Sequence, residues 1–138
     1  MKTCKLLREQ VAAATGSKKA ELVLKNAQIV NVFTQSVETG DIAIEGGYIV
    51  GIGNYEGITE KDLGGAYVCP GFLDGHIHIE SSMTSPGEFE RAVVPHGTIA
   101  VITDPHEIAN VAGTAGIRFM MQSAQKLDLD VYFMLPSC

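Results

Sequence analysis

Four residues with chemically reactive side chains recur at every second position of one short stretch, namely Asp74, His76, His78 and Glu80. Because successive side chains of a strand point to opposite faces, a strand here places all four on one face, with two imidazoles side by side. Neutral imidazole is the commonest metal ligand in proteins, and an H-x-H pair can hold one divalent cation. The spacing therefore predicts that His76 and His78 bind one metal ion. Asp74 lies on the same face two residues before His76, further from the end of the expected strand. We therefore expect it to orient a ligand histidine or cap a backbone group.

A second group of such residues follows the β-branched run of residues 98–103, which is typical of a strand buried on both faces. Asp104 and His106 come directly after it. In a parallel β/α arrangement the carboxyl ends of neighbouring strands meet at one edge, so we expect Glu80, Asp104 and His106 to lie near the imidazole pair. They are candidate catalytic residues, for proton transfer or a further metal position. Glu80 could equally bond a backbone amide, and Asp104 before Pro105 could be only a turn former.

These motifs resemble a known family. Pro-Gly-Phe at residues 70–72, followed by Asp-x-His-x-His at residues 74–78, resembles the first barrel strand of the amidohydrolase superfamily, whose members are metal-dependent hydrolases. Glu-Ser-Ser at residues 80–82 and Asp-Pro-His-Glu-Ile-Ala-Asn at residues 104–110 are similar to the bacterial adenine deaminases within it. The resemblance extends from about Glu21 to the last residue.

The resemblance implies a reaction and a cofactor. Adenine would be the substrate, hydrolysed at C6 to hypoxanthine and ammonia in purine salvage, with Mn2+, Fe2+ or Zn2+ activating the water. The family also uses a carboxylate from the fourth barrel strand, histidines from the fifth and sixth, and an aspartate from the eighth. A (β/α)8 barrel needs about 250 residues, whereas this chain has 138. We therefore expect an N-terminal portion of a longer enzyme, with negligible activity alone.

The elements before the reactive stretch change from helical to strand periodicity. Apolar residues at helical spacing predict a helix over residues 3–14, within an N-terminal arm of residues 1–20. From there, alternation predicts strands over residues 21–69, with Gly-Gly at residues 46–47 as a hairpin turn. We expect a small antiparallel sheet, which the resemblance identifies as a partial β-sandwich. The polar residues 54–65 are interpreted as a connector.

Residues 70–138 predict a strand, helix, strand, helix, strand order. The first helix is expected to start after a cap at Ser85 and the second to span residues 112–127, and the last strand to span residues 130–135. The fold class is therefore α/β with parallel strands. The resemblance identifies this part as the first βαβαβ portion of a truncated (β/α)8 TIM-type barrel.

Composition excludes several classes of partner. The net charge of −6 comes without a basic block, which argues against nucleic acid or an anionic membrane surface. No window approaches about 18 consecutive apolar residues, so we expect no membrane span. The lack of a signal-peptide core, together with three widely spaced cysteines that suit free thiols, favours the cytoplasm. The lack of a C-x-x-C motif excludes the His/Cys zinc deaminases.

Two alternatives to an adenine deaminase stay open. One is another cyclic amidohydrolase, similar to dihydroorotases or hydantoinases. The other is a non-catalytic module for association, because half of a sandwich leaves an apolar face or strand edge that another chain must cover. The same open face predicts a homo-oligomer.

Overall fold

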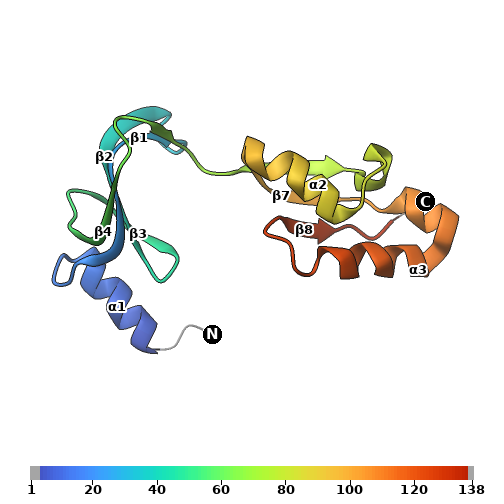
Figure 1. Cartoon of the computed structure of the whole chain (residues 1–138), viewed down its shortest axis with the longest axis horizontal. Helices are drawn as coiled ribbons and strands as arrows, with labels where there is room; N and C mark the ends of the chain where they lie inside the picture. The colour runs from blue at the N-terminus through green and yellow to red at the C-terminus, as the bar shows by residue number, and fades with distance from the viewer. Residues whose placement is uncertain (1–3, 137–138) are drawn as a thin grey trace. The chain divides into compact units, whose positions relative to one another are not determined.

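The computed structural model describes residues 4–136 and divides the chain into two compact units, Met1–Pro70 and Gly71–Cys138 (Figure 1). Among the described residues, the first unit combines a β-sheet with one helix and the second combines a β-sheet with several, which confirms the α/β class. Within the described range, no helix is long and apolar enough to cross a lipid bilayer.

The first unit begins with the expected N-terminal helix, α1 (Cys4–Ala14), while Thr3 lies outside the described residues. Ala13 of this helix is fully buried against Ala20, Val23 and Ala43 of the sheet. Its small side chain lets the helix approach the strands closely, so one face of the sheet is covered.

The sheet of the first unit is mixed rather than purely antiparallel. Its strands are β1 (Ala20–Asn31), β2 (Ser36–Glu45), β3 (Tyr48–Gly53), β4 (Gly57–Asp62) and β5 (Tyr67–Val68). The order is β3-β2-β1-β4, with β5 also pairing with β1. The antiparallel prediction holds for β1 to β3, and the glycines at 46–47 both have positive φ, as a primed hairpin turn requires. β4 and β5 instead run parallel to β1.

The connector predicted for residues 54–65 is wrong, because β4 lies within it. β4 pairs with β1 at the edge of the sheet, and five of its six residues are exposed. An edge strand with both faces in solvent needs no alternation of apolar and polar residues, so its polar composition concealed it.

A β-bulge in β1 is stabilised by one buried carboxylate. The β1–β2 register shifts between Leu24 and Ala27, where Asn26 has a left-handed φ of 56°. The Asp41 carboxylate accepts the Asn26 N–H at 3.1 Å and forms an ion pair with Lys25. The Lys25 ammonium, through this hydrogen bond, lowers the pKa of Asp41 below its usual value.

We expect the first unit to lose stability in acid. The hydrogen bonds from Lys25 and Lys18 lower the pKa values of Asp41 and Glu45, respectively. A carboxylate with a lowered folded-state pKa stabilises the fold above its unfolded value, about 4, and this contribution is lost as the pH falls through the folded value. Urea midpoints measured by circular dichroism should be level from pH 5 to 8 and fall below pH 4.

Asp41→Asn should cost about 1.5–3 kcal/mol at pH 7, because it weakens a charge-assisted hydrogen bond, and should flatten the acid dependence. Glu56→Gln is the matched control, because the Lys19–Glu56 ion pair is exposed on both sides. An acid dependence that Asp41→Asn leaves unchanged would contradict this account.

The second unit is a parallel β/α arrangement, as predicted. Its elements are β6 (Phe72–Ile77), η1 (Ile79–Ser82), α2 (Pro86–Val93), η2 (Val94–His96), β7 (Thr98–Thr103), α3 (His106–Ala124) and β8 (Asp130–Phe133). The three strands are parallel in the order β6-β7-β8. One core joins the sheet to both helices, formed by Ile79, Phe89, Val101, Met120 and Leu129.

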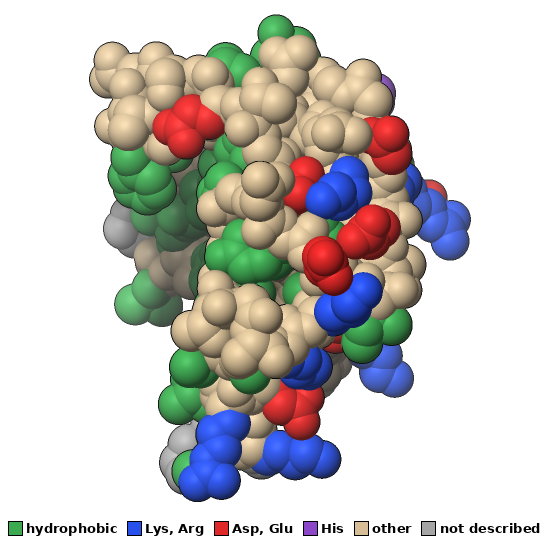
Figure 2. All heavy atoms as spheres, turned by 90° about the vertical axis from the view of Figure 1, so that its left-hand side faces the viewer, with side chains coloured by type: hydrophobic (Ala, Val, Ile, Leu, Met, Phe, Trp, Pro, Cys, Tyr) green, Lys and Arg blue, Asp and Glu red, His purple; other side chains and the backbone are tan. Residues whose placement is uncertain are grey.

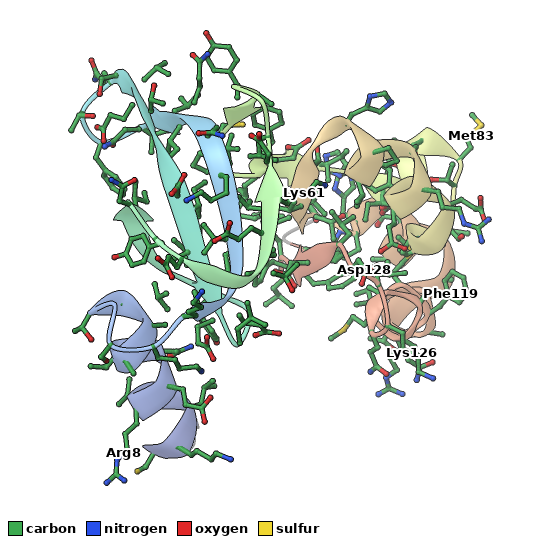
Figure 3. The ribbon with its side chains drawn as sticks, turned by 60° about the vertical axis from the view of Figure 1, so that its left-hand side comes forward. Arg8, Lys61, Met83, Phe119, Lys126 and Asp128 are labelled. Carbon is green, nitrogen blue, oxygen red and sulfur yellow. The ribbon has the colours of Figure 1, made fainter. Side chains whose placement is uncertain are left out.

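Four predicted boundaries in this unit differ from the structure. β6 ends at Ile77, because Ile79 turns into the core and its segment becomes the 3-10 helix η1. Met83 closes η1 in a left-handed conformation and points away from the ribbon (Figure 3). α3 begins at His106 rather than residue 112, since the apolar periodicity used to place it belongs to the part after the non-helical Gly113. It ends at Ala124 rather than residue 127. β8 ends at Phe133, two residues before the predicted end at 135.

The face of the first sheet opposite α1 carries apolar side chains without cover from the described residues. Ile49 and Ile52 of β3 are 66% and 53% exposed, and Phe33 is 95% exposed. They line a hollow of about 350 Å³ together with Ile29 and Ile42. Figure 2 shows hydrophobic side chains exposed at the surface of the chain, alongside charged ones. The predicted open apolar face is therefore present.

Candidate metal centre

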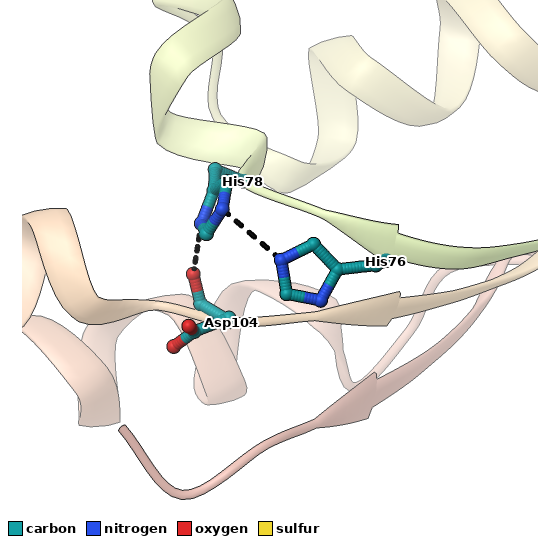
Figure 4. A group of neighbouring side chains, drawn as sticks. All are labelled: His76, His78 and Asp104. Carbon is teal, nitrogen blue, oxygen red and sulfur yellow. Dashed lines mark hydrogen bonds between the residues drawn. The ribbon is translucent and has the colours of Figure 1, made fainter. Parts of the chain in front are cut away.

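The structure brings His76 and His78 together at the carboxyl end of β6. His76 lies on the strand and is exposed, whereas His78 follows the strand and is half-buried. Their Nε2 atoms are 3.2 Å apart, and the ring planes meet at 83° (Figure 4). Both side chains therefore direct the same nitrogen toward one point.

A main-chain carbonyl fixes the orientation of His78. Its Nδ1 lies 2.8 Å from the carbonyl oxygen of Asp104, as Figure 4 shows. A carbonyl oxygen only accepts, so Nδ1 carries the proton and Nε2 presents its lone pair. Metal-binding histidines are commonly held in this way, by a hydrogen bond from the nitrogen that does not bind the metal.

The distance between the imidazoles fits a bound cation. Two nitrogens that each lie about 2.0–2.1 Å from a tetrahedral zinc ion are about 3.3–3.4 Å apart, by simple geometry. The observed 3.2 Å is close to this value. Asp104 supplies a third potential ligand atom, and the ligand atoms of all three residues lie within 4.8 Å of one another. The site can therefore hold one divalent cation and leave positions for other ligands.

Asp104 also contacts His106, the first residue of α3. Its Oδ2 lies 3.0 Å from His106 Nδ1, and the His106 ring centroid is 4.6 Å from that of His78. With Nδ1 donating to the carboxylate, Nε2 of His106 is free to accept a proton. Asp104 thus bonds one imidazole through its carbonyl and another through its carboxylate, which is more than a turn former does.

The other two acidic residues of the stretch bond to backbone amides. Asp74 Oδ1 accepts the N–H of His76 at 3.0 Å, so it caps a backbone group of the imidazole pair, as expected. Glu80 lies on η1 rather than on the strand, and its Oε1 accepts the N–H of Ile108 at 3.2 Å. Within residues 4–136, the group that could hold a cation consists of His76, His78 and Asp104, without Glu80.

The parallel β/α unit with an H-x-H pair at the end of its first strand agrees with the resemblance to the amidohydrolase superfamily. The sequence profile of the Amidohydrolase family matches residues 67–138, and the chain belongs to this family.

Among curated proteins the chain is similar to adenine deaminases, which confirms the narrower resemblance. It is 58% identical to adenine deaminase 2 of Carboxydothermus hydrogenoformans over 97% of this chain and 24% of that protein. It is 59% identical to the adenine deaminase of Geobacillus kaustophilus over 96% of this chain and 23% of that protein. The chain thus spans about a quarter of the length of the curated relatives it matches.

A solved structure supports the fold. The N-acyl-D-glutamate deacylase of Bordetella bronchiseptica matches 62% of this chain with a TM-score of 0.51 and 21% identity, over 19% of its own length. At this identity the likeness concerns the fold alone.

Proposed function

We propose that this chain supplies the first part of the metal centre of an adenine deaminase, which converts adenine and water into hypoxanthine and ammonia in purine salvage. The observation that carries the proposal is the imidazole pair. The Nε2 atoms of His76 and His78 lie 3.2 Å apart, and the Asp104 carbonyl fixes the His78 tautomer, in a chain 58% identical to an adenine deaminase.

In this proposal His76 and His78 hold the cation, which would be Mn2+, Fe2+ or Zn2+. When bound, it supplies Lewis-acid activation of the attacking water. His106, oriented by the Asp104 carboxylate, exchanges a proton at Nε2, either with the water or with the departing amine.

The two units fit this role as parts of a larger architecture. We propose that residues 70–138 form the opening βαβαβ portion of a (β/α)8 barrel, supported by the parallel order β6-β7-β8. Residues 21–69 would form part of a β-sandwich, preceded by the helical arm of residues 1–20. The exposed free thiols of Cys4 and Cys69 support a cytoplasmic location, whereas Cys138 lies outside the described residues.

The test is ammonia release from adenine with added Mn2+ or Fe2+. We expect no turnover above background for the 138-residue chain, because two imidazoles and one His–Asp pair cannot enclose adenine and exclude water. A longer protein that carries this sequence should turn adenine over. Turnover by the 138-residue chain at the rate of the longer protein would contradict the expectation. A longer protein inactive on adenine but active on hydantoin or dihydroorotate would instead identify another cyclic amidohydrolase.

The open apolar face favours a second property, self-association of the chain. In a solution of the purified chain, a second copy of the chain supplies the apolar surface that can cover this face. We propose a homo-oligomer on this ground, with Ile49 and Ile52 at its contact.

A further inference from the structure

Glu80 connects the segment that follows His78 to the helix that begins with His106. The first N–H groups of a helix lack intrahelical partners, and the N-cap residue of α3, Pro105, provides no side-chain hydrogen bond to them. The Glu80 carboxylate accepts one of these groups, the N–H of Ile108, at 3.2 Å. A negative charge at this end of a helix is favoured by the helix dipole. Glu80 therefore caps α3 from another element.

A second bond joins the same two elements. Ser81 Oγ donates to Glu107 Oε2 at 2.6 Å, so two adjacent residues of η1 bond two adjacent residues of α3. We call these four residues, Glu80, Ser81, Glu107 and Ile108, the η1–α3 clamp. Ile79 is fully buried in the core beside it, which anchors η1 to the body of the unit.

The position of the clamp bears directly on the two imidazole sites. His78 immediately precedes η1, and His106 is the first residue of α3. A change in the contact between η1 and α3 therefore changes the placement of His78 relative to His106, whose ring centroids are 4.6 Å apart.

We propose that Glu80 is a positioning residue rather than a metal ligand or proton carrier. It acts through the η1–α3 clamp and fixes the positions of His78 and His106 relative to each other. This inference rests on the proposed metal centre and adds a role within it. One Glu80 oxygen is engaged by a backbone amide, and the other, Oε2, is buried without a hydrogen-bond partner among the described residues. Neither oxygen belongs to the group that could hold a cation.

Two substitutions distinguish a positioning role of Glu80 from a role as metal ligand or proton carrier. Glu80→Gln keeps the side-chain shape and a carbonyl oxygen that can accept the Ile108 N–H, but it removes the charge and the capacity to carry a proton. Glu80→Ala removes the acceptor. Glu90→Ala is the matched control, because Glu90 also accepts a backbone N–H of this unit, that of Leu129 at 3.1 Å, at a place remote from α3's first turn.

Titration of the 138-residue chain with Co2+ reports the site through affinity and visible absorption. We expect Glu80→Gln to stay within about twofold of the parent chain and Glu80→Ala to weaken binding about tenfold and alter the spectrum, as loss of an outer support of a metal site does. Glu90→Ala should lower the unfolding midpoint and leave both Co2+ readouts unchanged.

Two NMR readouts require no metal. Amide hydrogen exchange at Ile108 should accelerate about tenfold in Glu80→Ala and stay near the parent rate in Glu80→Gln. The imidazole shifts of His78 and His106 should move in Glu80→Ala but not in Glu90→Ala.

The proposal is overturned if Glu80→Gln loses Co2+ binding as Glu80→Ala does, because Glu80 would then act through its charge or proton. It is also overturned if Ile108 exchange or the two imidazole shifts do not change in Glu80→Ala. A parent chain that binds no Co2+ would contradict the metal centre itself, and the two NMR readouts would still decide whether Glu80 positions the imidazoles.

Discussion

Replacing His76 with alanine should weaken Co2+ or Mn2+ binding by more than about 100-fold. Loss of an outer support typically costs 10–100-fold in metal affinity, and loss of one of two nitrogen donors should exceed that. His76 is exposed and its ring contacts His78 at 4.9 Å between centroids, so the substitution removes a donor without opening a core cavity. Isothermal titration of the metal into the chain measures the effect.

His78→Ala should cost as much affinity, with an additional structural effect. His78 is half-buried and donates to the Asp104 carbonyl, so its loss also leaves that carbonyl without this bond. We therefore expect a lower unfolding midpoint for His78→Ala than for His76→Ala.

His96→Ala is the control for both substitutions. It removes an imidazole from the same unit, at an exposed position on η2, before β7 begins. Metal affinity should be unchanged in this variant. Equal affinity of the parent chain and His76→Ala would contradict the imidazole pair as the binding site.

The imidazole pair could be predicted from sequence because it depends on local geometry. Alternation along a strand requires only that residues 74–78 be extended, and β6 covers that stretch through Ile77. The alternation does not extend to Glu80, because Ile79 packs into the core and the chain there forms the 3-10 helix η1. Tertiary packing thus ended the strand alternation at Ile79, directly after the imidazole pair.

The role of the Asp104 main chain could not be predicted from side-chain patterns. The carbonyl that fixes His78 is a backbone atom, and every residue has one. Its placement depends on the register of β6 against β7, in which Ile77 pairs with Thr103 and the Asp104 N–H donates to the Ile77 carbonyl at 2.9 Å. Such pairings between segments some 26 residues apart are specified by the fold as a whole.

The edge strand β4 and the start of α3 both escaped prediction. β4 lacks the apolar periodicity that marks a buried element, and α3 begins with the polar residues His106 and Glu107. In β4 solvent covers the exposed residues, and in α3 the first turn carries His106 and Glu107, whose contacts are polar. Sequence patterns report burial, so an exposed edge strand and a polar helix start are the parts that they miss.

Substituting Ile49 and Ile52 together with lysine should make the chain monomeric. The two side chains are 66% and 53% exposed on the open apolar face, beside the 350 Å³ hollow. Burying such a side chain in a contact contributes about 1.5–3 kcal/mol, and each 1.4 kcal/mol is tenfold in affinity. Loss of both should weaken self-association by at least about 100-fold. Sedimentation velocity over a range of concentrations measures it.

Ile58→Lys distinguishes association through the apolar face from association through the edge of the sheet. Ile58 is 72% exposed on the edge strand β4 and does not line the hollow. If copies associate face to face, Ile58→Lys behaves as the parent chain does, whereas association through the β4 edge would make it the more damaging change. A parent chain that sediments as a monomer at every concentration would show that the face does not drive association. The homo-oligomer proposal would then fail while the metal centre, which lies in the other unit, would be unaffected.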